Sequence, residues 1–380
     1  MVEHKILRAE SGRLPVLVIG PTRPLRGGIP LYTSAAIRHL AAQYEVRAVG
    51  FTRLYPRWLY PGRSQYEAGL EPDPNVAYWV DPFRPTAWQQ LAKIIREFSY
   101  GLILAPWWAS FWTPLYTYVG LLKRVPLILM CHNFIPHEKK LIDYIATFLA
   151  LKVGDAYLTF SSAVAGYIQR SFPGRPVVFC RLPSITSELN LQLIPKDIAR
   201  DEIGIPRDYI VFLFWGIIRR YKGLELLLKA TAELSYSNVY LLVVGEFWDS
   251  RDYYVKMVQQ LGLQDRVLIW DYYMSLERLL VFISAADAVV LPYRDTSQSA
   301  VLRLTLDLGV PAVAADLPGL REVAGEAGQV LFHEPGDHTD LARRMEEIAD
   351  RRCPAGSSFR EIDDGWSSFI QCVNSLVEAL

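Results

Sequence analysis

Short apolar runs rich in β-branched residues alternate with amphipathic stretches along most of this 380-residue chain. Strands separated by helical stretches of this length form parallel βαβ units. The pattern therefore predicts an α/β protein with two doubly wound parallel sheets. The expected strands of the first sheet are 16–20, 45–51, 101–106, 127–133, 156–162 and 177–183, and those of the second are 209–216, 239–246, 266–272, 288–293, 312–316 and 329–332.

The polar stretch 184–206 separates the two series and contains no convincing strand. We therefore expect two Rossmann-like domains, 1–186 and 187–361. Residues 366–380 have the apolar spacing of an amphipathic helix, and the segment 362–380 is a candidate to pack back on the N-terminal domain. Two facing domains of this kind would place the carboxyl ends of both sheets around one cleft.

Composition excludes several classes of protein. With 51% hydrophobic and 21% charged residues, the chain is not disordered. Its four cysteines are far apart and form no CxxC pair, which indicates neither a zinc site nor a disulfide framework and favours a reducing compartment. The polar N-terminus MVEHKILRAESGR lacks the apolar core of a signal peptide, so we expect a cytoplasmic protein.

One uncharged segment, 98–122, is long enough to span a bilayer. Pro106 and Pro114 interrupt it, however, and they favour a buried strand followed by the helix TPLYTYVGLLKR. We therefore expect no transmembrane span there.

Charge is divided unevenly between the halves. The net charge is zero overall, about +9 over residues 1–190 and about −9 over 191–380. The basic half also holds Trp58, Trp79, Trp88, Trp107, Trp108 and Trp112, for two of which, Trp107 and Trp108, core packing is the alternative. Cations and tryptophans together suit a lipid-phosphate-linked glycan at a membrane face better than a nucleic acid. The segment 52–66, TRLYPRWLYPGRSQY, is either a contact with an anionic membrane or a loop over the acceptor glycan.

Two loops of the first half carry candidate binding groups. Gly27 and Gly28 follow the first strand, where adjacent glycines let a ligand approach the backbone and the next helix offers free amides. His132 lies at the carboxyl end of the strand LILMCHN, a position suited to a ligand-binding side chain or general base. His137 and Glu138 are interpreted as first-turn helix residues.

Two loops of the second half are suited to anions. The strand ending at Gly216 is followed by Arg219, Arg220 and Lys222, whose charges add to the dipole of the next helix and predict a diphosphate pocket. Solvated surface charge is the alternative. After the strand AVVLPY comes a run of polar residues, for which plain helix capping is the alternative to donor contact: Thr296, Ser297, Gln298 and Ser299.

The order of these motifs resembles one family. RGGIPLYT, CHNFIPHE, GIIRRYKGLELLLKA and VVLPYRDTSQSAVLRLTLDLGVPAVAADLPGLREV are similar, in this order, to the retaining nucleotide-sugar-dependent glycosyltransferases of family 4. The resemblance covers residues 16 to about 350 and implies the GT-B fold of two facing Rossmann-like domains. It is strongest to the bacterial polysaccharide-assembly branch, whose first half also resembles FTRLYPRWLYPGRSQYE at 51–67.

The resemblance implies a role for each matching residue. His132 would sit beside the transferred sugar, Lys222 with Arg219 or Arg220 would bind the diphosphate, and the glycines would allow close approach of the donor. The implied catalytic residues are His132, Lys222 and Arg219. The implied donor-binding residues are Gly27, Gly28, Gly216, Arg220, Gly245, Thr296, Ser297, Gln298, Ser299, Ala300 and Val301.

Three positions depart from the family pattern. Ile217 replaces the arginine that most members carry after the strand-ending glycine, so Arg219 or Arg220 would have to supply that charge. Thr296 and Leu304 stand where most members have two glutamates, which weakens the sugar 3-hydroxyl contact and removes the usual ribose partner.

The resemblance implies transfer of a sugar from a nucleoside-diphosphate donor to a glycan or lipid-linked glycan acceptor, with retention, in exopolysaccharide or cell-surface glycan assembly. No Asp-x-Asp occurs in the sequence, so we expect neither a metal nor another cofactor. The alternatives are a noncatalytic sugar-nucleotide sensor on the same shell, and a sugar phosphorylase or sugar-nucleotide epimerase.

Overall fold

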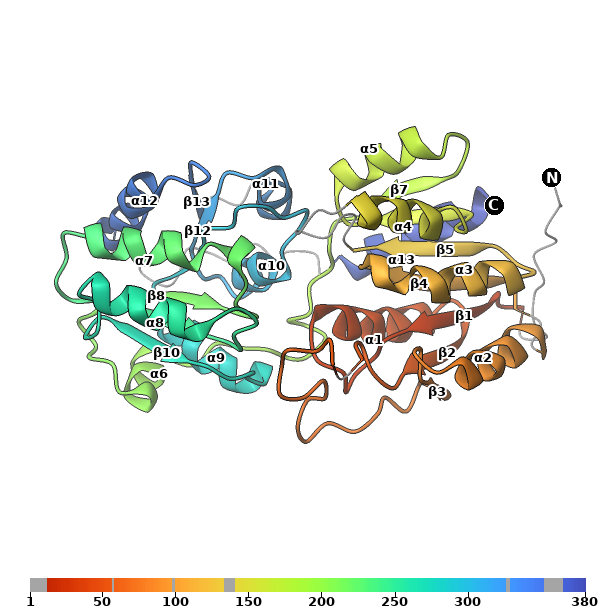
Figure 1. Ribbon diagram of the computed structural model, residues 1–380, viewed down its shortest axis with the longest axis horizontal. Helices are drawn as coiled ribbons and strands as arrows, with labels where there is room; N and C mark the ends of the chain where they lie inside the picture. The colour runs from red at the N-terminus through yellow and green to blue at the C-terminus, as the bar shows by residue number, and fades with distance from the viewer. Residues whose placement is uncertain (1–11, 57, 98–99, 133–140, 326–328, 352–364) are drawn as a thin grey trace. The chain divides into compact units, whose positions relative to one another are not determined.

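The first sheet is built around β1, Pro15–Gly20, whose six residues are all buried. The computed structural model describes residues 12–56, 58–97, 100–132, 141–325, 329–351 and 365–380. Seven strands, all paired in parallel, follow the order β3-β2-β1-β4-β5-β6-β7 (Figure 1). The remaining strands are β2 Glu45–Phe51, β3 Tyr78–Val80, β4 Leu102–Trp107, β5 Leu127–Cys131, β6 Ala156–Thr159 and β7 Val177–Phe179.

The helices of this unit cover the two faces of the sheet. Right-handed crossovers put α1 on one face and α2 to α5 on the other, and contacts between α2 and α3 and between α3 and α4 agree. Their bounds are α1 Gly28–Leu40, α2 Pro85–Glu97, the short 3₁₀ turn η1 Ser110–Trp112, α3 Thr113–Leu122, α4 Leu141–Leu151 and α5 Ser162–Ser171.

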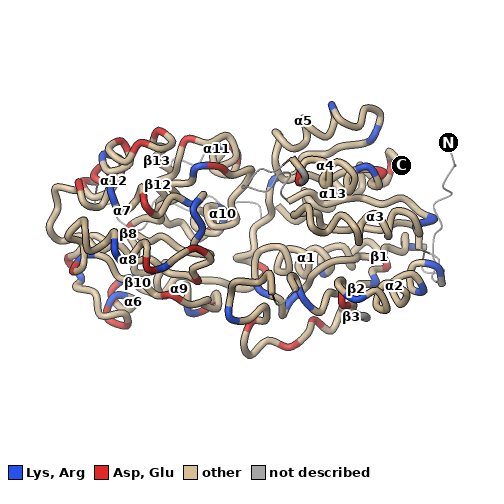
Figure 2. Tube along the Cα trace, viewed as in Figure 1, with Lys and Arg blue, Asp and Glu red and all other residues tan. Residues whose placement is uncertain are grey.

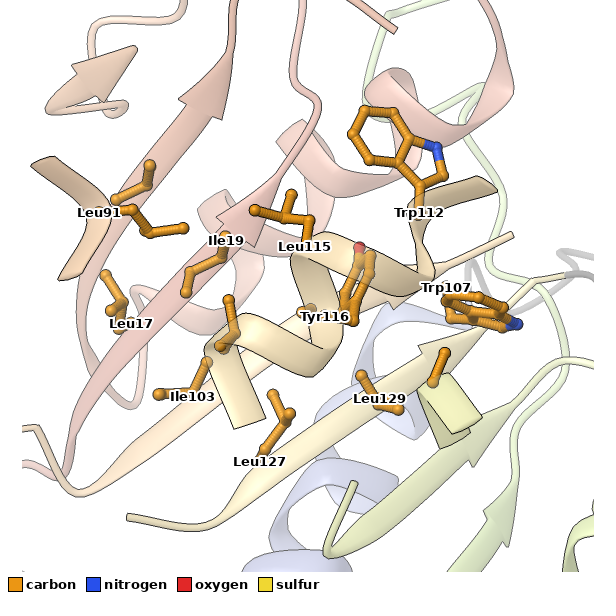
Figure 3. Close-up of a cluster of buried hydrophobic side chains, with 14 of the residues drawn as sticks. Leu17, Ile19, Leu91, Ile103, Trp107, Trp112, Leu115, Tyr116, Leu127 and Leu129 are labelled. Atoms are coloured by element: carbon orange, nitrogen blue, oxygen red, sulfur yellow. The ribbon is translucent and has the colours of Figure 1, made fainter. Parts of the chain in front are cut away.

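The core of this unit lies between the sheet and the second set of helices. Leu17, Ile103 and Leu127 from neighbouring strands lie beneath Leu115 and Tyr116 of α3 (Figure 3). The tryptophans Trp107 and Trp112 are fully buried in the same cluster, and Trp88 and Trp108 pack against it. Tryptophan enrichment in the first half therefore reflects core packing more than a membrane surface, with Trp58, 85% exposed, as the exception.

The second sheet has six parallel strands in the order β10-β9-β8-β11-β12-β13 (Figure 1). Its central strand β8 is a nearly continuous apolar run, as expected for a strand covered on both faces. The bounds are β8 Ile210–Trp215, β9 Val239–Val244, β10 Val267–Trp270, β11 Ala288–Leu291, β12 Ala312–Ala315 and β13 Val330–His333.

Helices α7, α8 and α12 share one face of this sheet, because α7 contacts both of the others; α10 contacts α11, and α6 packs on α9. The bounds are α6 Lys196–Ile203, the 3₁₀ turn η2 Arg220–Lys222, α7 Leu224–Glu233, α8 Arg251–Gln260, α9 Leu276–Ala285, α10 Ala300–Asp307, α11 Pro318–Ala324 and α12 His338–Arg351.

The chain divides into two compact units, one comprising Met1–Pro183 and Gly365–Leu380 and the other Ser184–Asp364. The last helix, α13 Trp366–Glu378, packs on α1, β6 and β7. Its Trp366 ring is stacked 4.4 Å from His39 of α1, and its buried side chains include Phe369, Ile370, Val373 and Leu376.

The predicted α/β class with two doubly wound parallel sheets is confirmed. All twelve expected strands are present, while β3 was missed because three residues show no alternation. The uncharged segment 98–122 forms β4, η1 and α3 where it is described, and no helix in the described part of the chain is long and apolar enough to cross a membrane. Asn133, His137, Glu138 and Cys353 lie outside the described residues; Cys131, Cys180 and Cys372 are free thiols.

Candidate functional site

The loop after β8 buries a lysine ammonium beside a glycine. Gly216 ends the strand with φ +103°, and a Cβ added there would lie 2.8 Å from Lys222 Nζ. Lys222 is only 7% exposed, and within the described residues no hydrogen bond or ion pair engages its ammonium. Burial and the neighbouring Arg219 lower the Lys222 pKa to about 8. A buried cation without a counter-ion is costly unless a ligand supplies the anion.

The loops after β8 and β9 are joined through their backbones. Ile218 donates its N–H to Glu246 (2.9 Å), and Trp248 donates to Ile218 (3.1 Å). A Cβ on Gly245, φ +149°, would lie 1.9 Å from the Gly216 carbonyl oxygen, so only glycine fits between the loops. These contacts fix the backbone around the Lys222 ammonium.

The structure separates the two neighbouring arginines. Arg219 lies close enough to Lys222 to lower its pKa, and its guanidinium is 5.9 Å from the Trp248 ring. Arg220 is exposed and instead lines a pocket of about 380 Å³ between α7 and α8, together with Tyr254 and Arg294. Arg219 is therefore the arginine placed to act with Lys222.

Replacing each of the two arginines separately by alanine tests this placement. Arg219→Ala should weaken nucleoside diphosphate binding about tenfold, because one charge-assisted hydrogen bond contributes about 1.5–3 kcal/mol. Arg220→Ala, which removes the same charge one residue away, should change the affinity less than twofold. Titration calorimetry measures both; equal losses would show that neither side chain contacts the ligand specifically.

The hydroxyl loop after β11 forms a helix cap. Ser299 Oγ accepts a hydrogen bond from Leu302 N–H (3.1 Å), and Thr296 Oγ1 donates to the Gln298 carbonyl (2.5 Å). The predicted capping by Ser299 is confirmed, and donor contact by Thr296, Ser297 and Gln298 stays a prediction. The amides of Ala300 and Val301 belong to the first helical turn, whose N–H groups have no intrahelical acceptors.

Val301 connects this helix to the buried lysine. A Cβ on Gly216 would lie 3.8 Å from Val301 Cγ2, so the start of α10 is near the Lys222 ammonium. Leu304, which replaces a family glutamate, is buried in α10 and cannot present a polar group. The second unit thus brings together Gly216, Arg219, Lys222, Gly245 and Val301.

The glycine pair of the first unit caps α1. Gly27 has φ +105° and precedes the helix without a side-chain cap, so the first amides of α1 stay available to a ligand. Gly28 begins the helix, and a Cβ on either glycine would meet open space. Positive φ explains glycine at 27 but not at 28.

His132 follows β5 and is buried in an aromatic setting. Its backbone N–H donates to the Trp107 carbonyl (2.9 Å), and its ring centroid lies 4.7 Å from that of Phe160 and 6.4 Å from that of Tyr32. Burial lowers the His132 pKa to about 3. The imidazole is therefore neutral at pH 7 and suited to hydrogen bonding with a sugar hydroxyl, not to carrying positive charge.

The segment 52–66 folds against the glycine loop. The Arg26 side chain donates to the Ser64 carbonyl (2.8 Å), and the backbones of Leu25 and Tyr66 pair in an isolated antiparallel β-bridge. Arg53, expected as a membrane contact, instead forms a two-point ion pair with Asp81 at 3.0 and 2.6 Å. The position beside the glycine loop favours the alternative interpretation, a loop on the acceptor side.

Sequence reasoning missed two residues that shape these loops. Gly319 of α11 allows close packing, since a Cβ there would lie 2.6 Å from the backbone of Thr296 and Ser297. Tyr293 places its ring 5.7 Å from Lys222 Nζ. A glycine in GLREV and a tyrosine ending a strand carry no signal of such contacts. In the described part of the chain, no three His, Cys, Asp or Glu side chains gather as metal ligands.

Comparisons with known proteins identify the family. Residues 26–180 match the model described as Glycosyltransferase Family 4, and residues 195–360 match Glycosyl transferases group 1. D-inositol 3-phosphate glycosyltransferase 1 of Catenulispora acidiphila is 30% identical over 190 residues, 46% of this chain and 45% of that protein. The corresponding enzyme of Mycolicibacterium smegmatis is 31% identical over 167 residues, 43% and 38% of the two chains. The alignments thus span less than half the length of these relatives.

Two solved structures show the same fold. Sucrose-phosphate synthase from Thermosynechococcus elongatus has a TM-score of 0.68 at 20% identity, covering 97% of this chain and 95% of that one. Anabaena HepE in complex with UDP and glucose has a TM-score of 0.72 at 16% identity, covering 96% and 98%. Matched by one model in each half and built on two parallel Rossmann-like sheets, the chain belongs to the GT-B glycosyltransferases of family 4.

Proposed function

We propose that this protein transfers a sugar from a nucleoside-diphosphate sugar to a glycan acceptor, with retention of anomeric configuration. The observation that carries the proposal is the ammonium of Lys222, which is buried beside Gly216 and, within the described residues, is engaged by no hydrogen bond or ion pair. A diphosphate would supply the missing anion. The solved structures of Anabaena HepE in complex with UDP and glucose and with UDP-glucose support this class of donor.

The chemistry follows from where charge develops. When the bond between sugar and diphosphate breaks, negative charge accumulates on the leaving diphosphate, and preorganised donors stabilise it most effectively. Lys222 and Arg219 supply two cations, and the first-turn amides of α10 supply N–H groups. In this proposal His132 holds a hydroxyl of the transferred sugar as a neutral hydrogen-bonding group.

The proposed acceptor is a lipid-linked glycan on the cytoplasmic side of a membrane, used in polysaccharide assembly. The basic excess of residues 1–190 supports an acceptor that carries phosphate. The names of the relatives offer a second candidate, a soluble phosphorylated polyol such as an inositol phosphate. Both acceptors carry a phosphate and differ in the lipid.

The test uses the full chain in two stages. A panel of UDP-, GDP-, ADP- and dTDP-linked sugars is first screened by thermal shift, because a ligand of the folded state raises the melting temperature. Nucleoside diphosphate release from the selected donor is then measured with and without each acceptor. Acceptor-dependent release supports transfer, and binding without release would indicate a sensor. Conversion of the donor without any acceptor would indicate an epimerase, and cleavage of a glycan by inorganic phosphate would indicate a phosphorylase.

Metal chelation provides an independent check. Since Lys222, Arg219 and helix amides can neutralise the diphosphate, we expect excess EDTA to leave the transfer rate unchanged within twofold. Abolition by EDTA with rescue by magnesium or manganese would overturn this leaving-group mechanism.

A further inference from the structure

Helix α4 exposes an uninterrupted apolar face. Its buried side consists of Thr147, Ala150 and Leu151. The opposite side, named here the α4 face, consists of Leu141 (78% exposed), Tyr144, Ile145 (55%), Phe148 and Leu149 (49%). This spacing of i, i+3, i+4, i+7 and i+8 forms one stripe. A surface helix normally presents polar side chains there, so the α4 face points to a partner.

No charge interrupts this surface. The sole charged residue of α4, Asp143, accepts a hydrogen bond from Ser110 Oγ (2.5 Å) and is half-buried. The neighbouring helix α3 has no charged residue, and Leu121 in its last turn is exposed. Figure 2 shows α3 in tan, the colour of residues other than Lys, Arg, Asp and Glu.

Cations border the α4 face at one end. Helices α3, α4 and α5 follow consecutive parallel strands, so their carboxyl ends lie along one edge of the sheet. Arg124, Lys152 and Arg170 lie at or just beyond these ends, all exposed, and no ion pair engages them within the described residues. The nearby Asp155 is already paired with Lys123.

A chain of ring contacts joins the border to the face. The guanidinium of Arg175 lies 5.4 Å from the Phe172 ring, which is stacked 5.2 Å from Phe148. Arg175 also donates to the Lys152 carbonyl at 2.8 Å, which fixes it at the end of α4. The apolar stripe of the α4 face and the cations at its border therefore form one continuous surface.

We propose that the α4 face docks this protein on an anionic lipid bilayer, with the stripe in the headgroup region and Arg124, Lys152 and Arg170 on lipid phosphates. Eleven residues give a helix of about 16 Å, which is too short to cross a bilayer and therefore lies along its surface. Charge complementarity favours this partner, because the three cations at the border of the α4 face match the phosphates of an anionic lipid surface. The docking rests on the proposed function only in that it would bring the enzyme to a lipid-linked acceptor.

The experiment is flotation of the full chain with vesicles of phosphatidylcholine containing 30% phosphatidylglycerol, without donor or acceptor. Binding should be strong at low salt and fall at high salt. Ile145→Ser/Leu149→Ser should weaken it at least tenfold. Lys152→Gln/Arg170→Gln should weaken it about fivefold per charge, since each basic residue near the surface contributes about that factor.

Matched controls keep the test specific. Trp58→Ser removes the most exposed tryptophan from the segment 52–66, and Lys93→Gln/Arg96→Gln removes two charges from α2; both should float like the unchanged protein. Equal losses in the controls would overturn the proposal. So would a dimer in sedimentation velocity that the Ile145/Leu149 variant dissolves while the unchanged protein ignores vesicles.

The outcome is separable from that of the proposed function. Flotation that depends on the α4 face, without sugar transfer to any acceptor, would leave the docking surface standing and remove the transferase assignment. Transfer without flotation would do the reverse.

Discussion

Replacing Lys222 by methionine should weaken nucleoside diphosphate binding ten- to hundredfold and at the same time raise the melting temperature. The loss of affinity follows from removing charge-assisted hydrogen bonds of about 1.5–3 kcal/mol. The gain in stability follows because no hydrogen bond or ion pair in the described part of the chain engages the buried ammonium, while methionine fills a similar volume and needs neither.

The gain should depend on pH. The folded-state pKa of Lys222, about 8, is below its ordinary value of 10.5, so the unfolded chain binds the proton more tightly. The charged lysine therefore costs stability at pH 7, by about 3 kcal/mol for this shift. The advantage of Lys222→Met should be complete below pH 8 and vanish as the pH rises to about 10.5.

Calorimetric titration and thermal unfolding between pH 7 and 10.5 measure both effects. Lys229→Met is the matched control, because Lys229 is an exposed lysine in the following helix. That variant should change neither quantity appreciably. Unchanged diphosphate affinity of Lys222→Met would remove this loop from the proposed donor site.

Gly245→Ala should destabilise the protein by more than about 3 kcal/mol, since the new methyl group would overlap the Gly216 carbonyl oxygen at 1.9 Å. The two loops would have to separate, which also displaces Gly216 from the Lys222 ammonium. We expect a melting temperature about 10 °C lower and loss of diphosphate binding by the protein that remains folded.

Gly262→Ala is the control for backbone strain alone. Gly262 also has a positive φ, +68°, but a Cβ there would meet no atom within 4 Å. Its replacement should cost about 1–2 kcal/mol, the ordinary penalty of the left-handed conformation. Similar melting temperatures for the two variants would contradict the proposed close contact between the loops.

Much of the fold could be predicted because the signal is local. A strand covered on both faces must be apolar throughout, so a run such as IVFLFW indicates a central strand of a parallel sheet. The glycine of the β8 loop and the capping serine Ser299 were likewise found from residue type and order. The three residues of β3 were not, because a short edge strand needs no distinctive composition.

The choice between Arg219 and Arg220 shows where such reasoning ends. Neighbouring side chains point in different directions, and the sequence gives both the same charge. Only the packing of the loops after β8 and β9 places Arg219 near Lys222 and Trp248, whereas Arg220 lines the pocket between α7 and α8. Burial of Lys222 is decided in the same way, by atoms distant in sequence.

The tryptophans and helix α4 also show that composition does not determine burial. Trp107 and Trp112 could belong to a surface by composition, yet Tyr116 of α3 packs on Trp107, and Phe51 and Phe83 pack on Trp112. Helix α4 is apolar enough to be buried all round, yet one side has no covering element in the described structure. The sequence by itself determined which segments form strands and helices and the order of the binding loops, because these depend on the periodicity and composition of neighbouring residues. Tertiary structure alone decided which charges are buried, which glycines are obligatory and which apolar face remains exposed, because burial is a property of contacts between segments far apart in the chain.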